Sequence, residues 1–411
     1  MKFALAVHGS RGDVEPHAAV ALELLRRGHD VRLAVPPDLH GLTESAGLAA
    51  LAYGPDTREV LFGKVWGKKN PIKLSAWKNY LGRVWLEMGT TLTALADGAD
   101  LLVTGSVHQG LAANVAEYYD IPLASLHSMP IRVNGQLVAG LPSPVTRAAI
   151  WGFWWAHWRL TREAENAQRR DLGLPKTTAP STQRIVRRGA LEIQAYEEFF
   201  FPGLAAEWAH CDGRRPFVGA LTMQLPTAAD DEVLSWIAAG TPPIYFSFGS
   251  TPIRSPADTV AMITAACEQL GERALVHSGA HDFSGIPHAG HVKVVGALNY
   301  GAVLPACRAI VHHGGAGTTA AGLRAGIPTL ILWIRNEQPL WGAVVKRLKV
   351  GSSQRLSSTT RKSLVAGLRG ILGAECSARA REIASRMTTP DVSVAAAADL
   401  LENAAGSGRV G

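Results

Sequence analysis

The sequence predicts an α/β protein made of two Rossmann-like, doubly wound parallel-sheet domains that face each other across a cleft. The 411 residues exceed what one ordinary core needs, so two domains of roughly 200 residues each are expected. Short apolar runs alternate with segments of helical spacing, which is the pattern of βαβ units. This alternation stops and then starts again in the second half of the chain, which indicates two such sheets in succession.

The first half begins with a βαβαβ pattern. An apolar run over residues 3–8 is followed by the turn-like segment Gly9-Ser10-Arg11-Gly12-Asp13 and then by apolar residues at helical spacing, with Gly28 as the stop. The later elements expected in this half are a strand over 29–35, a strand over 100–104, a helix over 111–119 and a strand over 121–126.

The same signals define the second half and the domain boundaries. The elements expected there are strands over 243–248, 274–277, 309–312 and 328–333, and helices over 259–270 and from the glycine-rich segment to Arg324. The predicted organisation is a first domain over 1–217, a linker over 218–232, a second domain over 233–390, and a C-terminal helix over 391–411 that packs back toward the first domain.

Composition narrows the class of protein but not its ligand. Apolar residues make up 47% of the chain and charged residues 18%, as in a globular protein. The net charge of +7 suits an anionic ligand, a membrane surface or a nucleic acid. No apolar run reaches the ~20 residues of a membrane span, and the strand-like start is shorter than a signal peptide, so a cytoplasmic protein is expected. The four cysteines are isolated in sequence, which favours neither a zinc site nor a disulfide framework.

The strongest chemical signal is the string His312-His313-Gly314-Gly315-Ala316-Gly317-Thr318-Thr319, which follows an apolar strand and opens a helix. The free N–H groups at a helix N-terminus and the helix dipole favour an anion, and glycines let a phosphate approach the backbone. A histidine and the threonine hydroxyls add further donors. The alternative is a generic glycine-rich turn with an ordinary helix cap, but the two histidines ahead of the glycines favour a phosphate site.

Glu337 and Gln338 follow the next expected strand. A carboxylate beside a carboxamide offers acceptors and a donor to neighbouring hydroxyl groups, which is what sugar recognition requires. Taken alone, this pair ahead of a helix is more typical of a helix cap. Its place at the next strand end after the glycine string is what favours sugar binding.

Four motifs occur in order along the chain: GSRGDVEP at 9–16, SFGS at 247–250, HHGGAGTT at 312–319 and QPLWG at 338–342. In this order and spacing the chain resembles the GT-B glycosyltransferases of family one, in particular the branch of actinobacterial antibiotic and glycolipid glycosyltransferases and sterol glucosyltransferases. The resemblance spans nearly the whole chain. It implies an inverting, metal-independent enzyme that moves a hexose or deoxyhexose from a UDP- or dTDP-sugar to a hydroxyl of a hydrophobic acceptor, such as a glycolipid, a lipopeptide or a natural-product aglycone.

The resemblance also assigns roles to matching positions, with the acceptor in the first domain and the nucleotide sugar in the second. The residues implied for the donor diphosphate are Ser250, His313, Gly315, Ala316, Gly317 and Thr318. Glu337 and Gln338 would bind the donor sugar, although the family usually has Asp-Gln there. Leu298 is the residue expected at the nucleobase. No cofactor is implied beyond the nucleotide-sugar co-substrate.

Asp13 is the residue that the resemblance implies as the catalytic base. An inverting transfer requires the acceptor hydroxyl to lose its proton as it attacks the anomeric carbon. An aspartate with an ordinary pKa of ~3.9 is a weak base, so we expect it to act through its position and by stabilising positive charge on the acceptor. The alternative role is the N-cap of the helix that follows.

Aromatic and basic residues interleave in two clusters that the resemblance places on the acceptor side. One lies over 62–86 and contains Trp66 and Trp77, the other lies over 151–158, and Ser10 is expected on the same side. Such a surface suits an amphiphilic acceptor presented at an anionic membrane. Ordinary aromatic packing beneath a solvated charged face is an equally good interpretation.

The expected partners are therefore a nucleotide sugar and an amphiphilic acceptor, with peripheral association at the inner face of the membrane and no nucleic acid. No DxD motif is present, so the glycine turn and His313 are expected to stabilise the leaving diphosphate in place of a metal. One alternative is a nucleotide-sugar epimerase or hydrolase on the same fold, and another is a non-enzymatic lipid or nucleic-acid binder. An NAD-dependent oxidoreductase is disfavoured, because Gly9-Ser10-Arg11-Gly12 lacks the G-x-G-x-x-G pattern.

Overall fold

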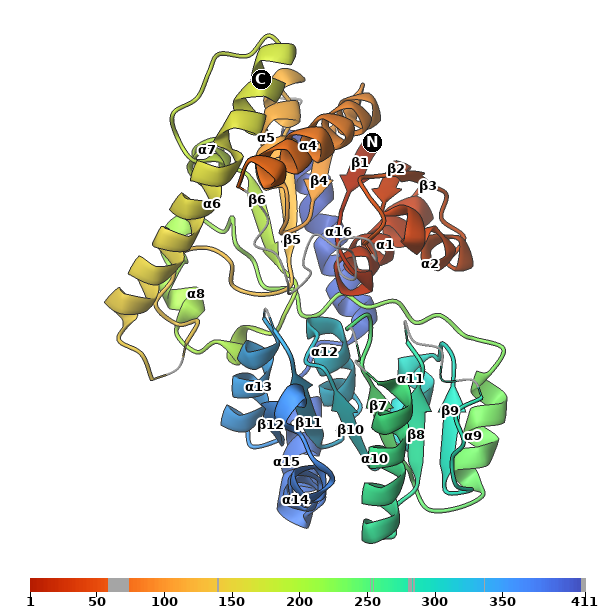
Figure 1. Ribbon diagram of the computed structural model, residues 1–411. Coiled ribbons are helices and arrows are strands. Elements are labelled where there is room, and N and C mark those ends of the chain that lie inside the picture. The colour runs from red at the N-terminus through yellow and green to blue at the C-terminus, as the bar shows by residue number, and fades with distance from the viewer. Residues whose placement is uncertain are drawn as a thin grey trace. The chain divides into compact units, whose positions relative to one another are not determined.

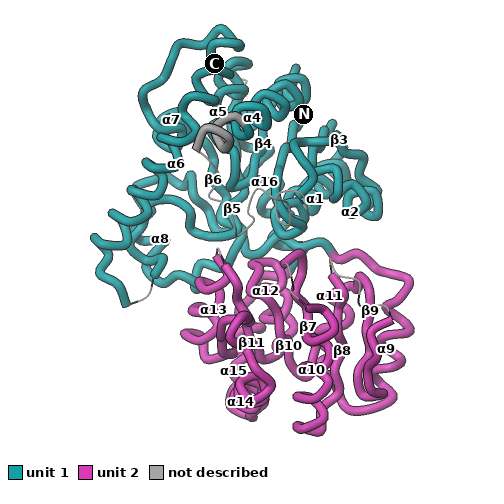
Figure 2. The backbone as a smooth tube through the Cα atoms, in the orientation of Figure 1, with its two compact units in different colours: residues 1–223, 390–411 teal, residues 224–389 magenta. Residues whose placement is uncertain are grey.

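Figure 1 shows the computed structural model, which describes residues 1–57, 74–138, 140–251, 253, 255–279, 283, 285–335 and 337–407, without the side chains of 74–79. The chain forms two compact units, residues 1–223 with 390–411 and residues 224–389 (Figure 2). Each unit contains a six-stranded sheet in which every pairing of neighbouring strands is parallel. The prediction of two doubly wound parallel sheets is confirmed.

Unit 1 has the strand order β3-β2-β1-β4-β5-β6. Its strands are β1 (Lys2–Ala6), β2 (Asp30–Val35), β3 (Ala50–Ala52), β4 (Leu101–Thr104), β5 (Leu123–His127) and β6 (Leu191–Gln194). Its helices are α1 (Arg11–Arg26), α2 (His40–Ser45), α4 (Leu74–Ala96), α5 (Gln109–Tyr118), α6 (Ser143–Asp171), α7 (Ser181–Arg187), α8 (Leu204–Glu207) and α16 (Pro390–Ser407). Since β1 pairs with β2 on one side and β4 on the other, the strand order reverses between β1 and β4.

The sheet of unit 1 is buried on both faces. Phe3 and Leu5 of β1 pack into one apolar cluster with residues of α1 and α16, whereas Ala4 and Ala6 pack into a second cluster with residues of α4 and α5. This alternation is the period of two that side chains follow along a strand. Burial on both faces explains why β1 appears in the sequence as a continuous apolar run.

Helix α16 belongs to unit 1, although it follows unit 2 in the chain. Its buried residues Ala397, Leu401 and Ala405 join the same cluster as Phe3. At the edge of this contact, Nη1 of Arg27 lies 2.6 Å from Asp399 and 2.7 Å from Glu402. Since Arg27 is the C-cap of α1, apolar burial and a salt-bridge network together hold α16 against α1.

Unit 2 has the strand order β12-β11-β10-β7-β8-β9. Its strands are β7 (Ile244–Ser247), β8 (Ala274–His277), β9 (Val292–Val295), β10 (Ala309–His312), β11 (Thr329–Trp333) and β12 (Gly351–Arg355). Its helices are α9 (Asp230–Ala238), α10 (Pro256–Leu270), α11 (Tyr300–Val303), α12 (Ala316–Arg324), α13 (Gln338–Arg347), α14 (Arg361–Ile371) and α15 (Ala374–Ala384). Here the strand order reverses between β10 and β7.

Shortening Leu401 to alanine should destabilise unit 1, because the fully buried side chain would leave a cavity in the cluster that also holds β1. We expect a loss of about 2–5 kcal/mol in the free energy of opening of this unit. Hydrogen exchange of β1 peptides measures that quantity directly. Val392→Ala, on the exposed side of the same helix, is the control, and equal protection of β1 in the two variants would contradict this role of α16.

Candidate active site

The glycine string lies at the switch point of unit 2. Strand β10 ends at His312 and β7 ends at Ser247, and these two residues are paired in the sheet. The loops that leave both strands, 313–315 and 248–251, therefore start side by side where the strand order reverses. In open α/β sheets, ligands bind in this crevice beyond the carboxyl ends of the strands.

The imidazole of His313 occupies space that side chains at two neighbouring positions would need. A Cβ at Gly249 would lie 2.6 Å from Cε1 of His313, and a Cβ at Gly315 would lie 2.7 Å from Nε2. Gly249 also has φ +56°, in the left-handed region. Glycine is required at both positions for the ring to sit where it does.

His313 is neutral at physiological pH. Burial lowers the pKa of its imidazole to about 4, although the backbone carbonyl of Ser247 raises it. A neutral imidazole has one N–H donor and one acceptor nitrogen. The neutral ring has a single N–H, so His313 donates to a phosphate oxygen in the tautomer whose N–H points away from the Ser247 carbonyl.

The first turn of α12 supplies the backbone groups expected for an anion site. Gly315 is the N-cap, so the N–H groups of Ala316, Gly317 and Thr318 find no acceptor within the helix. Apart from its chain neighbours and its own helix backbone, none of the described residues has an atom within 4 Å of the position that a Cβ of Gly317 would take, so this side of the turn faces open space. The Thr319 hydroxyl is buried and donates to the Gly315 carbonyl over 2.8 Å, which leaves half-buried Thr318 as the hydroxyl nearer the surface.

Gln338 shapes the loop after β11. Its Oε1 accepts hydrogen bonds from the backbone N–H of Ile334 over 2.7 Å and of Arg335 over 3.2 Å. The side-chain carbonyl is therefore occupied, and the NH₂ group is the part suited to a sugar hydroxyl. Half-buried Glu337 precedes it at the N-cap of α13.

Gly314 brings the glycine string into contact with the start of the QPLWG motif. It has φ +95°, and a Cβ there would lie 2.8 Å from the side chain of Ile331 and 3.1 Å from the carbonyl oxygen of Gln338. The glycine string thus packs directly against the start of α13. The residues expected for diphosphate and for sugar are adjacent within unit 2.

The structure places Ser250 and Leu298 differently with respect to solvent. Ser250 is half-buried and follows Gly249 in the loop after β7. Leu298 is 4% exposed and packs in the core with Val233 and Tyr245, so its side chain is not available to a base. The two residues just before it, Gly296 and Ala297, are exposed.

In unit 1 the corresponding loop follows β1. Helix α1 begins at Arg11 with Ser10 as N-cap, and Oδ2 of Asp13 accepts hydrogen bonds from the Ser10 N–H over 2.8 Å and from its hydroxyl over 3.0 Å. Asp13 is thus the N3 residue of a capping box, and the alternative in which it is itself the N-cap is wrong. A Cβ at Gly9 would lie 2.4 Å from Oδ2, so glycine is needed there for the carboxylate to reach Ser10.

The surroundings of Asp13 change its basicity. Burial raises the pKa of its carboxyl group, while the hydrogen bonds from Ser10 and the nearby imidazole of His8 lower it, with burial the larger effect. A raised pKa makes the carboxylate a stronger base than the free side chain. The sequence argument used the ordinary pKa of an aspartate and took no account of this burial.

Two histidines lie close to this loop, and sequence reasoning assigned a role to neither. The ring of His8, directly before Gly9, packs edge-on against that of His108 with centroids 5.7 Å apart, and its Nε2 lies 2.9 Å from the Pro55 carbonyl oxygen. Burial lowers the pKa of both, that of His108 to about 3. Both rings are therefore harder to protonate than a free imidazole. The position of His8 at the end of the first strand was the signal available in the sequence.

The other residues expected on the acceptor side differ in how far the structure describes them. Ser10 caps α1, Trp66 lies outside the described residues, and Trp77 lies in α4 in a stretch whose side chains are not described. His127 is fully buried, with Nε2 at 2.9 Å from both Ser125 and Gln109, as a structural histidine would be.

The described part of the chain contains no cluster of three or more His, Cys, Asp or Glu side chains that could hold a metal ion. Over the same residues, no helix combines the length and apolar character needed to cross a bilayer. The four cysteines are free thiols.

Two family models match parts of the chain. Residues 254–403 match the C-terminal domain of erythromycin biosynthesis protein CIII-like proteins, and residues 3–78 match the glycosyltransferase family 28 N-terminal domain. An uncharacterized glycosyltransferase of Mycobacterium leprae is 62% identical over 98% of this chain and 97% of its own length.

Solved structures share the fold over nearly the whole chain. The glycosyltransferase of kitacinnamycin superposes with a TM-score of 0.69 at 18% identity and covers 98% of both chains. The glycosyltransferase VinC, solved in complex with dTDP, superposes with a TM-score of 0.65 at 16% identity and covers 99% of this chain and 100% of its own.

Replacing Gly249 by alanine should weaken binding of a nucleoside diphosphate. The added methyl group needs the space of the His313 ring, and the left-handed backbone adds about 1–2 kcal/mol of strain. We expect the Kd of dTDP or UDP, measured by calorimetry, to rise about tenfold or more. Gly370→Ala in α14 is the control, since a Cβ there meets nothing within 4 Å. Equal affinities of the Gly249 variant and the native protein would show that this loop does not form the diphosphate site.

Proposed function

Because the chain belongs to the family 1 glycosyltransferases of the GT-B fold, we propose that it moves a hexose or deoxyhexose from a UDP- or dTDP-sugar to a hydroxyl group of a hydrophobic acceptor. We further propose that the transfer inverts the anomeric centre and uses no metal. The observation that carries the proposal is the His313 ring wedged between Gly249 and Gly315 at the N-terminus of α12.

The donor would be held in unit 2. The N–H groups of the first turn of α12 and the neutral His313 ring provide donors for the diphosphate, and the helix dipole favours its negative charge. These groups need no rearrangement as charge grows on the leaving diphosphate, so they stabilise the transition state. The NH₂ group of Gln338 and the carboxylate of Glu337 would bind the sugar hydroxyls.

The acceptor would be activated in unit 1. Asp13 would accept the proton of the acceptor hydroxyl as its oxygen attacks the anomeric carbon, and burial has raised the pKa of this carboxyl group for that role. The two hydrogen bonds from Ser10 to one carboxylate oxygen, Oδ2, hold the side chain in place. The proposed reaction requires the acceptor hydroxyl next to Asp13 to meet the sugar held by unit 2.

The second candidate is hydrolysis or epimerisation of the nucleotide sugar in the same donor site. The diphosphate groups of unit 2 would serve it equally well. It differs in needing no acceptor, which makes the two functions separable by experiment.

We place the proposed transfer in the cytoplasm, at the inner face of the membrane where the acceptor is a lipid.

A mass-spectrometric screen tests the transfer directly. UDP- and dTDP-sugars are incubated with amphiphilic alcohols and glycolipids, with and without EDTA, and we expect a product heavier than an acceptor by one sugar in both arms. Release of free sugar with no acceptor product would support hydrolysis instead. Loss of product only in the EDTA arm would show that the reaction uses a metal.

Asp13→Asn should lower turnover by ~10²-fold or more, as loss of a general base typically does, while the Kd for the nucleoside diphosphate stays the same. Glu15→Gln is the matched control, because it neutralises another carboxylate two residues further along α1. Initial rates and calorimetry on both variants give the comparison. Native turnover in the Asp13 variant would place the base elsewhere.

A further inference from the structure

Helix α6 presents an apolar face to solvent. The exposed residues between 144 and 160 are Pro144, Val145, Arg147, Ala148, Ala149, Trp151, Phe153, Trp155, Ala156, Arg159 and Leu160. Among them Trp151 is 56% exposed, Phe153 62% and Trp155 46%. A helix on the surface of a globular protein normally turns polar residues outward. Large exposed apolar patches of this kind mark interaction surfaces.

The opposite face of α6 is firmly anchored in unit 1. The Trp154 Nε1 donates to the Ile131 carbonyl oxygen over 2.6 Å, and further along the helix Arg169 contacts Glu117 over 2.7 Å. Thr161 and Gln168 are buried on the same side. Helix α6 is therefore packed against unit 1. Its aromatic side chains are exposed because of their positions around the helix, and not because the helix is detached from the unit.

Every Asp, Glu, Lys or Arg residue between Ser143 and Arg162 is positively charged. No aspartate or glutamate occurs from Ser143 to Arg162, whereas three arginines do. The Arg159 guanidinium lies 5.5 Å from the ring centroid of Trp155, a cation–π arrangement on the exposed face. An apolar surface fringed by arginines complements a surface that is apolar inside and anionic outside.

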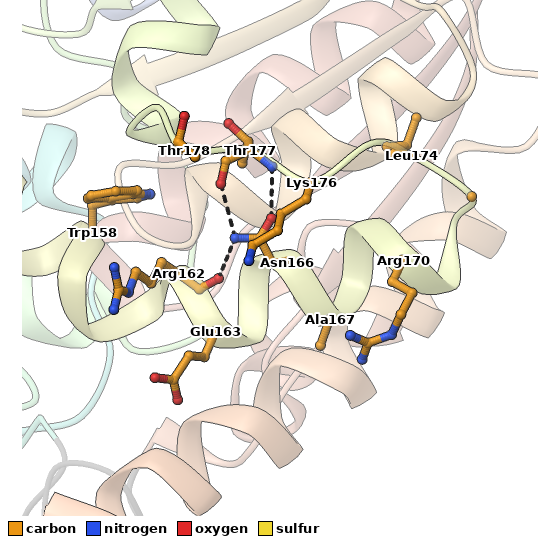
Figure 3. Close-up of a pocket in the computed structure, with 11 residues that line it drawn as sticks. Trp158, Arg162, Glu163, Asn166, Ala167, Arg170, Leu174, Lys176, Thr177 and Thr178 are labelled. Atoms are coloured by element: carbon orange, nitrogen blue, oxygen red, sulfur yellow. Dashed lines mark hydrogen bonds between the residues drawn. The ribbon is translucent and has the colours of Figure 1, made fainter.

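A basic hollow continues this face toward the C-terminal end of α6. Trp151, Trp155, Arg159, Arg162, Asn166 and Arg170 follow one another at spacings of three or four residues and therefore form one stripe along the helix. The hollow has a volume of about 820 Å³, and Figure 3 shows Trp158 and Arg162 on one side of it and Arg170 on the other.

The wall of the hollow is built by the segment after α6. Asn166 exchanges two hydrogen bonds with the backbone of Thr177, of 2.9 and 3.1 Å, which tie this segment to the helix and bring Lys176 to the rim. The buried Nε1 of Trp158 has no hydrogen-bond partner among the described residues. Three cations, Arg162, Arg170 and Lys176, and one carboxylate, that of Glu163, thus line the hollow, which leaves a net positive charge suited to an anionic group.

We propose that the outward face of α6 lies on the surface of an anionic lipid bilayer, with Trp151 and Trp155 at the boundary between headgroups and acyl chains and with a lipid phosphate in the adjoining hollow. Aromatic and basic residues on one face of a helix are the composition that binds a bilayer interface in plane. The inference rests on and deepens the proposed function, which places the transfer at the membrane, but binding to a bilayer requires neither donor nor acceptor.

A second copy of the chain suits this face less well. Two such faces packed together would set Arg159 and Arg162 of one copy near those of the other, and like charges brought together at an interface oppose association. An anionic bilayer instead places lipid phosphates beside these arginines.

Sedimentation of the full-length protein with lipid vesicles tests the proposal. We expect binding to phosphatidylcholine vesicles that contain phosphatidylglycerol, weakening as salt is raised. The test variant is Trp151→Ser with Trp155→Ser, and its control carries Leu51→Ser and Val392→Ser at exposed apolar positions elsewhere in unit 1. Partition of the test variant should fall by at least ~10-fold, since burial of aromatic area drives interfacial binding, and that of the control should not.

A second pair of variants separates the hollow from general charge. Arg162→Ala, Arg170→Ala and Lys176→Ala together should weaken binding to the anionic vesicles more than Arg361→Ala, Lys362→Ala and Arg369→Ala in α14, which remove the same charge. The proposal is overturned if the native protein stays in the supernatant, if the aromatic variant sediments like the native protein, or if light scattering shows a dimer that only this variant breaks. Binding of dTDP is measured in every variant and reports on the donor site alone. A variant that loses vesicle binding but keeps dTDP binding therefore tests the membrane surface, whereas loss of dTDP binding would count against the proposed donor site.

Discussion

Burial of the central strands on both faces is the constraint on which the rest of this protein depends. Residues 309–312 of β10 are fully buried, as are Ala4, Leu5 and Ala6 of β1. Such strands leave little room for polar groups along their length, so the polar residues gather in the loops at the carboxyl ends. In both units a histidine stands shortly after the central strand, followed by glycine: His8 and Gly9 after β1, His313 and Gly314 after β10.

Burial also sets the pKa values of the titratable side chains near these loops. The imidazoles of His8, His108 and His313 all have lowered pKa values because they are withdrawn from water, so they serve as neutral donors and acceptors. The same withdrawal raises the pKa of Asp13. One physical cause thus produces uncharged hydrogen-bonding groups in both units and a stronger base in one of them.

The sequence predicted the parts of the fold that depend on local pattern. The apolar runs that form β8 and β10 were placed at their observed bounds, because central strands are continuous apolar segments. Strand β12, with the sequence GSSQR, was missed because it is an edge strand paired only with β11, and backbone pairing, not apolar pattern, defines it. The glycine string was recognised from its own residues. The burial of Leu298 and the contact of His8 with Pro55 depend on distant parts of the chain, which no local signal reports.

The return of α16 to unit 1 has a consequence for biosynthesis. Residues 224–389 form an uninterrupted stretch, so unit 2 has all of its chain once Thr389 has left the ribosome. Most of unit 1 is synthesised first. The apolar cluster beside β1 is nevertheless not fully covered until α16 has been synthesised. During translation the earlier-made half therefore waits with apolar surface uncovered, which makes the nascent chain, more than the finished protein, the form that needs protection by chaperones.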